Sequence, residues 1–168
     1  MRRRPLLLLA GAALAGCEAS PPAESARLPP GSVEGAGDPT RAAIARSAFF
    51  FARMPPTDDL RAVARAVADM EFLAASLPSD PRYSADPLLP GRLRQARQEW
   101  RTALGIPMDV PAQAIVDRLW RIHEGAPDPE LAPRLLALPA LPRTREAAAA
   151  AARVQDQPSG PRLFSRPW

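Results

Sequence analysis

Two side chains could carry acid–base chemistry, Glu71 and His123. Glu71 falls near the middle of an apolar helical stripe, where a carboxylate either takes an edge position and pairs with an arginine from another helix or serves catalysis. A histidine base needs a nucleophile within hydrogen-bond reach and a group that orients it. Asp117 and Glu124 project away from His123, and its sequence neighbours supply neither partner. We therefore assign no catalytic residue, and we expect His123 to be a packed residue that donates to a helix carbonyl.

The inventory of residues excludes several kinds of chemistry. The chain has no lysine, so it has no phosphate-loop lysine and no pyridoxal Schiff base. Its single cysteine, Cys17, cannot form a disulfide or a multi-thiolate zinc site within one chain, and its single histidine removes multi-histidine metal sites. We expect no metal and no cofactor.

Three arginines, Arg94, Arg97 and Arg101, form a ridge along one predicted helix. Such a ridge is either a surface for anions or a partner, or a solvated face with salt bridges. Arginine, alanine and proline are abundant while lysine and asparagine are absent, a pattern typical of GC-rich coding. Each arginine is therefore weaker evidence for a binding surface than it would be in an average protein.

The N-terminal residues indicate where the protein is sent. Arg2, Arg3 and Arg4 precede an apolar stretch, residues 6–16, whose 11 residues are too few for a membrane-spanning helix of roughly 20. The stretch ends in Leu14-Ala15-Gly16-Cys17. This segment resembles a bacterial lipoprotein signal, and the rest of the chain resembles no family that we recognise.

The resemblance implies that Leu14, Ala15 and Gly16 are recognised by the signal peptidase, that residues 1–16 are removed, and that Cys17 is acylated and anchors the protein in a lipid bilayer. In lipoproteins of this kind an Asp directly after the cysteine favours the inner membrane. Glu18 stands there, so the resemblance implies the outer membrane, facing the periplasm. Two alternatives stay open: an ordinary secretory signal with a chance cysteine, and a host with a single membrane, where the protein would lie on the outer leaflet of that membrane.

Two segments have the composition of linkers. Residues 17–40 are rich in proline, glycine and serine and have few large apolar residues, so we expect a lipidated, disordered tether that holds the domain off the bilayer. Residues 157–168 are expected to form a flexible tail or a short docking motif. Cleavage would leave 19 arginines against 18 acidic residues, a net charge of +1, so we expect no nucleic-acid partner.

Residues 41–156 have helical periodicity and no convincing alternation. The caps and breakers predict helices over 39–53, 58–77, 91–104, 111–124, 130–138 and 144–155, with Asp38, Thr57 and Thr144 as N-terminal caps. Arg65 and Asp69 are expected on an outer face. The alanines of 147–152 favour close packing or fraying. The predicted fold is an all-α domain, a small bundle of four to six helices.

The helix predicted over 39–53 is apolar almost all round, which is typical of a buried central helix. Its Phe49-Phe50-Phe51 cluster could instead face a partner or the membrane surface. The sequence as a whole favours a non-catalytic envelope lipoprotein, an adaptor, assembly factor or structural accessory that contacts an envelope protein. The alternatives are a periplasmic enzyme that uses Glu71 and His123, and a carrier of lipids or small molecules. The oligomeric state stays open.

Overall fold

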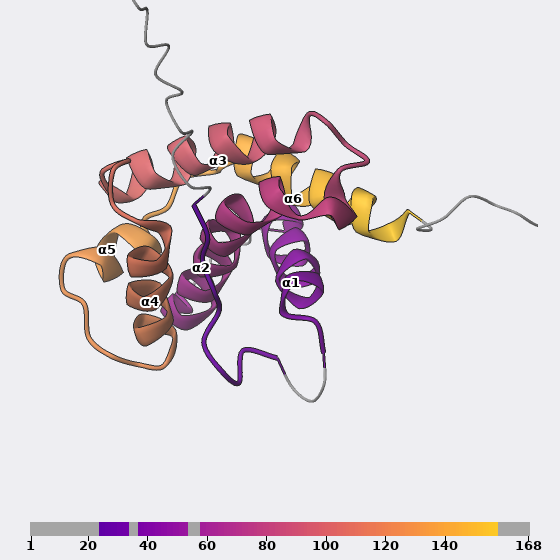
Figure 1. The fold of residues 1–168 in the computed structure, drawn as a ribbon. Coiled ribbons are helices and arrows are strands. Elements are labelled where there is room, and N and C mark those ends of the chain that lie inside the picture. Colours follow the sequence, from indigo (N-terminus) through magenta and orange to yellow (C-terminus); the bar gives the residue numbers. More distant parts are fainter. Residues whose placement is uncertain (1–23, 34–36, 54–57, 158–168) are drawn as a thin grey trace, which may run out of the picture.

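The computed structural model describes residues 24–33, 37–53 and 58–157, and its secondary structure in these ranges is helical (Figure 1). Two short 3₁₀ turns, Leu77–Ser79 and Pro81–Tyr83, follow the second helix. The α-helices are α1 Pro39–Arg53, α2 Leu60–Ser76, α3 Leu89–Leu104, α4 Ala112–His123, α5 Leu131–Leu136 and α6 Pro142–Asp156. The all-α bundle predicted from periodicity is confirmed, and the described ranges contain six α-helices, the upper end of the predicted four to six.

The central helix is α2, not the helix over 39–53 as the apolar pattern predicted. Twelve of the seventeen residues of α2 are buried, and it packs against α1, α3, α4 and α5. Only five of the fifteen residues of α1 are buried, and Phe49 is 63% exposed. Alanines contribute much of the apolar appearance of α1, but an alanine side chain has little apolar surface to bury, and Ala45 and Ala52 are exposed.

Side-chain caps explain where several helices begin. Asp38 accepts a hydrogen bond from the backbone N–H of Thr40 at 2.8 Å, and Asp59 accepts one from Ala62 at 3.0 Å. Asp59, rather than Thr57, is thus the cap of α2, and Thr57 itself lies outside the described residues. Gly105 ends α3 with a φ of 66°, the left-handed conformation that glycine adopts readily at the end of a helix.

The last helix begins earlier than predicted. α6 starts at Pro142, which is preorganised for a first helical turn, so Thr144 lies inside the helix and is buried. The carboxylate of Glu99, on α3, takes the capping role and accepts from the N–H groups of Arg143 and Thr144 at 3.2 and 2.8 Å. The alanines of 147–152 pack closely rather than fray, because α6 lies against α1 and α3. Four of these alanines are buried: Ala147, Ala148, Ala150 and Ala151.

Part of the predicted tether lies against the helices. Residues 24–33 run along α2 and α4 (Figure 1), with the carbonyl of Ala26 accepting from Ser76 Oγ at 3.2 Å. Arg27 exchanges two hydrogen bonds with the Gln113 side chain, at 2.7 and 3.1 Å. The packed chain therefore reaches back to Glu24. Residues 17–23 and 34–36 of the predicted tether, and residues 158–168 of the predicted tail, lie outside the described ranges.

Candidate functional site

The residues predicted to direct processing are not among those that the structure describes. Cys17 and the recognition residues Leu14, Ala15 and Gly16 lie outside the described ranges, so their roles stay predictions. The predicted chemistry within the domain can be compared directly with the geometry, and it falls into two charged clusters.

The predicted ridge of Arg94, Arg97 and Arg101 is not a common surface. Arg101 is completely buried, the side chain of Arg97 is 13% exposed, and only Arg94 is exposed. The reason is the position of the ridge on α3, beside the stripe of Leu93, Ala96 and Trp100, so that its two later members point into the bundle. A strip of three arginines for anions is therefore excluded.

The first charged cluster is centred on Glu71 of α2, which is completely buried. Its Oε1 accepts from Arg97 Nε at 2.8 Å and from Arg101 Nη2. Its Oε2 accepts from Trp100 Nε1 at 2.8 Å and from Arg101 Nε at 3.3 Å. The predicted pairing of Glu71 with arginine from another helix is thus confirmed, although at a buried position rather than at an edge.

The two arginines extend this cluster to segments that are far apart in the sequence. Arg101 Nη1 donates to three carbonyls of the loop between α3 and α4, those of Pro107, Met108 and Val110, at 2.9, 3.2 and 2.8 Å. Arg97 donates to the carboxylate of Glu24, which also accepts from the N–H of Ala112 at 2.7 Å, in the first turn of α4. The cluster thus fastens the N-terminal segment, α2, α3, the loop and α4 together.

This arrangement can stabilise the fold but offers little to a substrate. Both oxygens of Glu71 are occupied by hydrogen-bond donors, and the side chain has no exposed area. A general base must reach the proton that it removes, directly or through one water. We therefore interpret Glu71 as a structural counter-ion for Arg97 and Arg101.

Sequence reasoning missed Glu24, which the proline- and serine-rich composition had assigned to the tether. The hydrogen bond from Arg97, opposed by burial and aided by the N–H of Ala112, lowers the pKa of Glu24 to about 2. The sequence contained one signal that this segment packs against the helices. Ala26 and Leu28 follow Glu24 by two and four residues, and both side chains contact the core.

The shifted pKa predicts an acid-dependent contribution of Glu24 to stability. Because its folded-state pKa lies below the ordinary value of 4.5, ionised Glu24 stabilises the fold above about pH 4.5, and this stabilisation is lost as the pH falls toward 2. Its side chain is 42% exposed, so Glu24→Gln should lower the free energy of unfolding by only about 1 kcal/mol at pH 7. Urea unfolding between pH 7 and pH 2.5 should show this difference shrinking, and a difference independent of pH would contradict it.

The second charged cluster lies between α1 and α2. Asp69 was expected on an outer face, but it is completely buried and forms a two-pronged pair with Arg46, with both N–O distances at 2.8 Å. Burial raises the pKa of Asp69, and the hydrogen bonds from Arg46 oppose that rise. Arg46 and Arg65 both donate to the carbonyl of Ser32, at 3.3 and 2.9 Å. The N-terminal segment covers this side of α2 and so helps to bury Asp69, which an uncovered helix would expose.

His123 joins this second cluster and not the first. Its Nδ1 lies 3.1 Å from the carbonyl oxygen of Arg61, and its Nε2 lies 3.3 Å from Arg65 Nη1. An Nδ1–H tautomer donates to the carbonyl and accepts from the arginine. The predicted bond to a helix carbonyl is confirmed, but the carbonyl belongs to α2. Glu71 follows Arg61 by ten residues, about 15 Å along the helix axis, so Glu71 and His123 do not form one catalytic pair.

Replacement of His123 should affect stability more than function. His123→Gln loses part of the bridge between α4 and α2, and we expect the free energy of unfolding to fall by about 1–2 kcal/mol. Urea unfolding measures this loss, and growth of a strain that carries the variant measures function. A variant that folds with normal stability yet reproduces the deletion phenotype would overturn the structural interpretation.

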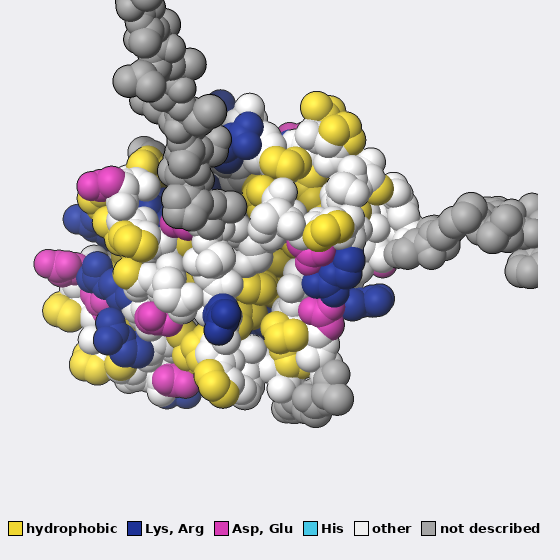
Figure 2. Space-filling view, in the orientation of Figure 1, with side chains coloured by type: hydrophobic (Ala, Val, Ile, Leu, Met, Phe, Trp, Pro, Cys, Tyr) yellow, Lys and Arg dark blue, Asp and Glu magenta, His cyan; other side chains and the backbone are white. Residues whose placement is uncertain are grey.

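The surface of the domain mixes charges with a few exposed apolar side chains. Arginines and acidic residues are interspersed over the face in Figure 2, so this face has no large region of one sign. An open cleft of about 670 Å³ lies between the C-terminal end of α1 and the segment that joins α5 to α6, with Phe50, Leu136 and Leu138 among its lining residues. Within the described ranges, no three His, Cys, Asp or Glu side chains are grouped as a metal site would need.

The same ranges contain no helix that is both long enough and apolar enough to cross a membrane.

Fold and clusters together define a class, an all-α bundle whose central helix carries two buried carboxylates paired with arginine. Comparison with protein-family models, curated proteins and solved structures finds no match for the chain.

Proposed function

We propose that this protein is a non-catalytic envelope lipoprotein, whose helical domain is held at a bacterial membrane by acylated Cys17 and acts as an adaptor, assembly factor or structural accessory. The observation that carries the proposal is the sequence Leu14-Ala15-Gly16-Cys17 behind a short apolar stretch and three arginines. Two or three acyl chains make attachment stable, because each buried methylene contributes about 0.8 kcal/mol.

The buried charges support the non-catalytic part of the proposal. Glu71, Asp69 and His123 are the residues from which an acid–base site would be built, and each is engaged in contacts that join helices. Glu71 and Asp69 have no exposed area, and His123 lies in the other cluster from Glu71. The polar residues of the bundle therefore fit a scaffold better than a reaction centre.

The proposal predicts complete dependence of membrane attachment on Cys17. Mass spectrometry of the purified protein should show a chain that begins at acylated Cys17, and Cys17→Ser should leave the membrane fraction. Glu18→Ala serves as a control, because it alters the neighbouring residue without removing the thiol that becomes acylated. Unmodified Cys17 in the mature protein, or a Cys17→Ser variant that remains in the membrane fraction, would overturn the proposal.

The residue after Cys17 supports placement in the outer membrane, facing the periplasm, since Glu18 stands where Asp would favour inner-membrane retention. Separation of the two membranes on a density gradient tests this placement. Recovery of the wild-type protein with inner-membrane markers would contradict it and would leave the proposed lipidation intact.

A further inference from the structure

We propose that the face of the domain where the chain enters at Glu24 lies against the lipid headgroups, held there by the short connection to Cys17. This face, called the entry face below, is defined by the exposed side chains of Arg27, Arg94 and Met108. The inference rests on the proposed lipidation of Cys17, and it adds which surface of the domain meets the bilayer.

The first step is that the chain is fastened to the domain from Glu24 onward. Arg97 donates to both carboxylate oxygens of Glu24, and the first turn of α4 donates through the N–H of Ala112. Arg97 is itself fixed by Glu71 in the core. The contacts of Ala26 and Arg27 continue the attachment along the segment. The segment that separates the packed domain from Cys17 therefore ends at Glu24 rather than at residue 40.

The second step compares lengths. Glu24 follows Cys17 by seven residues, and a chain of that length spans at most about 25 Å. A domain of this size is ~35 Å across. The connection is thus shorter than the width of the domain, so the side remote from Glu24 cannot turn toward the bilayer while Glu24 stays attached.

The third step is the chemistry of the entry face. Arg94 lies one turn before Arg97 on α3, and the backbone of Arg27 is hydrogen-bonded to Gln113 in the first turn of α4. Two arginines with exposed side chains are thus attached to the domain close to the contacts that hold Glu24. Arginine forms two-pronged hydrogen bonds with phosphate. Met108 is 48% exposed in the loop that leads into α4, and Arg101 holds this loop through three carbonyls. Asp109, next to Met108, and Asp117, which accepts from Gln113 at 2.8 Å, are exposed as well. These two carboxylates balance the two arginines, so contact with the headgroups rests on hydrogen bonds to individual phosphates rather than on net positive charge.

Because acylation consumes the thiol of Cys17, an introduced cysteine would be the single free thiol of the mature protein. We would label Met108→Cys on the entry face and Ala126→Cys as the matched control. Ala126 is exposed beyond the far end of α4, about 18 Å along the helix axis from Ala112. The purified lipidated variants are placed in phosphatidylethanolamine–phosphatidylglycerol vesicles that contain a lipid with a nitroxide headgroup, and quenching of the fluorescent label is measured.

We expect quenching of the label at position 108 to exceed quenching at position 126 about threefold. The label at position 108 would lie at the depth of the headgroups, where the nitroxides can contact it, whereas the label at position 126 would lie too far from the bilayer. Insertion of about 20 Gly and Ser residues between positions 23 and 24 adds roughly 25 Å of reach and should reduce this difference. Equal quenching in vesicle-bound protein, or a difference that the insertion leaves unchanged, would overturn the inference alone. Protein that stays free of the vesicles with an unmodified Cys17 would overturn the proposed function as well.

Discussion

Glu71→Gln should destabilise the domain by about 3–5 kcal/mol, the range found when one partner of a buried ion pair is removed. Glutamine has nearly the same shape, so the substitution leaves packing intact and removes the charge. Two arginines then face a neutral amide, and Arg101 has no exposed area through which water could solvate it. Small domains have roughly 5–15 kcal/mol of stability, so the variant should be barely folded at 37 °C. Urea unfolding monitored by circular dichroism measures the loss.

Glu146→Gln is the matched control for this variant. Glu146 is a glutamate of α6 whose side chain is 66% exposed and whose Oε1 lies 3.6 Å from Nε of Arg92. The same change there should alter the free energy of unfolding by at most about 0.5 kcal/mol. A loss below about 1 kcal/mol in Glu71→Gln would contradict the interpretation of Glu71 as the counter-ion of the core.

The position of Glu71 also shows what could be predicted from the sequence. Its place on an apolar stripe predicted a paired carboxylate, and that pairing is confirmed. The burial of Asp69 and Arg101 could not be predicted from the helical pattern, because both positions lie beside the apolar stripe of their own helix. Asp69 is covered by Arg46 of another helix, and Arg101 is surrounded by the loop after α3. These contacts depend on tertiary packing, which periodicity does not encode.

The choice of the central helix failed for a related reason. Periodicity counts each alanine of α1 as an apolar residue, whereas burial depends on how much surface the neighbours can cover. α2 combines alanines with Val67, Met70 and Leu73, which fill the space between α1, α3 and α4. Composition likewise assigned Glu24 to a tether, because one ion pair with Arg97 leaves no trace in the local pattern.

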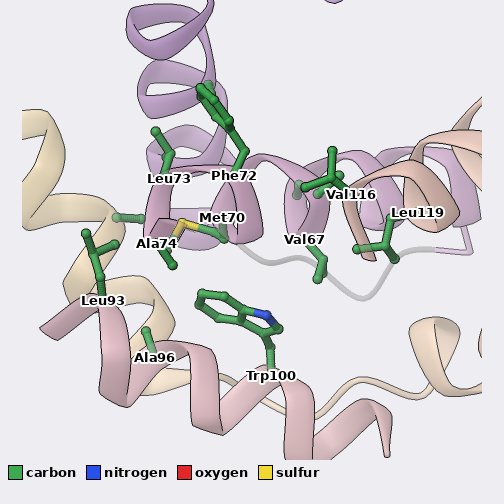
Figure 3. Close-up of a cluster of buried hydrophobic side chains, with 14 of the residues drawn as sticks. Val67, Met70, Phe72, Leu73, Ala74, Leu93, Ala96, Trp100, Val116 and Leu119 are labelled. Atoms are coloured by element: carbon green, nitrogen blue, oxygen red, sulfur yellow. The ribbon is translucent and has the colours of Figure 1, made fainter. Parts of the chain in front are cut away.

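Trp100→Ala should destabilise the domain by about 3–5 kcal/mol, for reasons of volume as well as polarity. The ring of Trp100 extends from α3 toward Val67 and Met70 of α2 (Figure 3), and the side chain has no exposed area. Its removal leaves a cavity between two helices and takes one donor from Glu71. Urea unfolding measures the total loss, and Leu88→Ala, at a residue that is 62% exposed, should change stability by at most about 0.5 kcal/mol.

Trp100→Phe separates the two contributions. Phenylalanine keeps most of the ring and lacks the Nε1–H group, so the variant should lose about 1–3 kcal/mol, chiefly for the missing hydrogen bond to Glu71. The remaining difference between Trp100→Phe and Trp100→Ala then measures packing between α2 and α3. Since Cys17 is the single cysteine, no disulfide within the chain can compensate for a loss of packing. Equal destabilisation by Phe and Ala would show that the volume of the ring contributes little, and the bundle would then depend on its buried ion pairs more than on its apolar core.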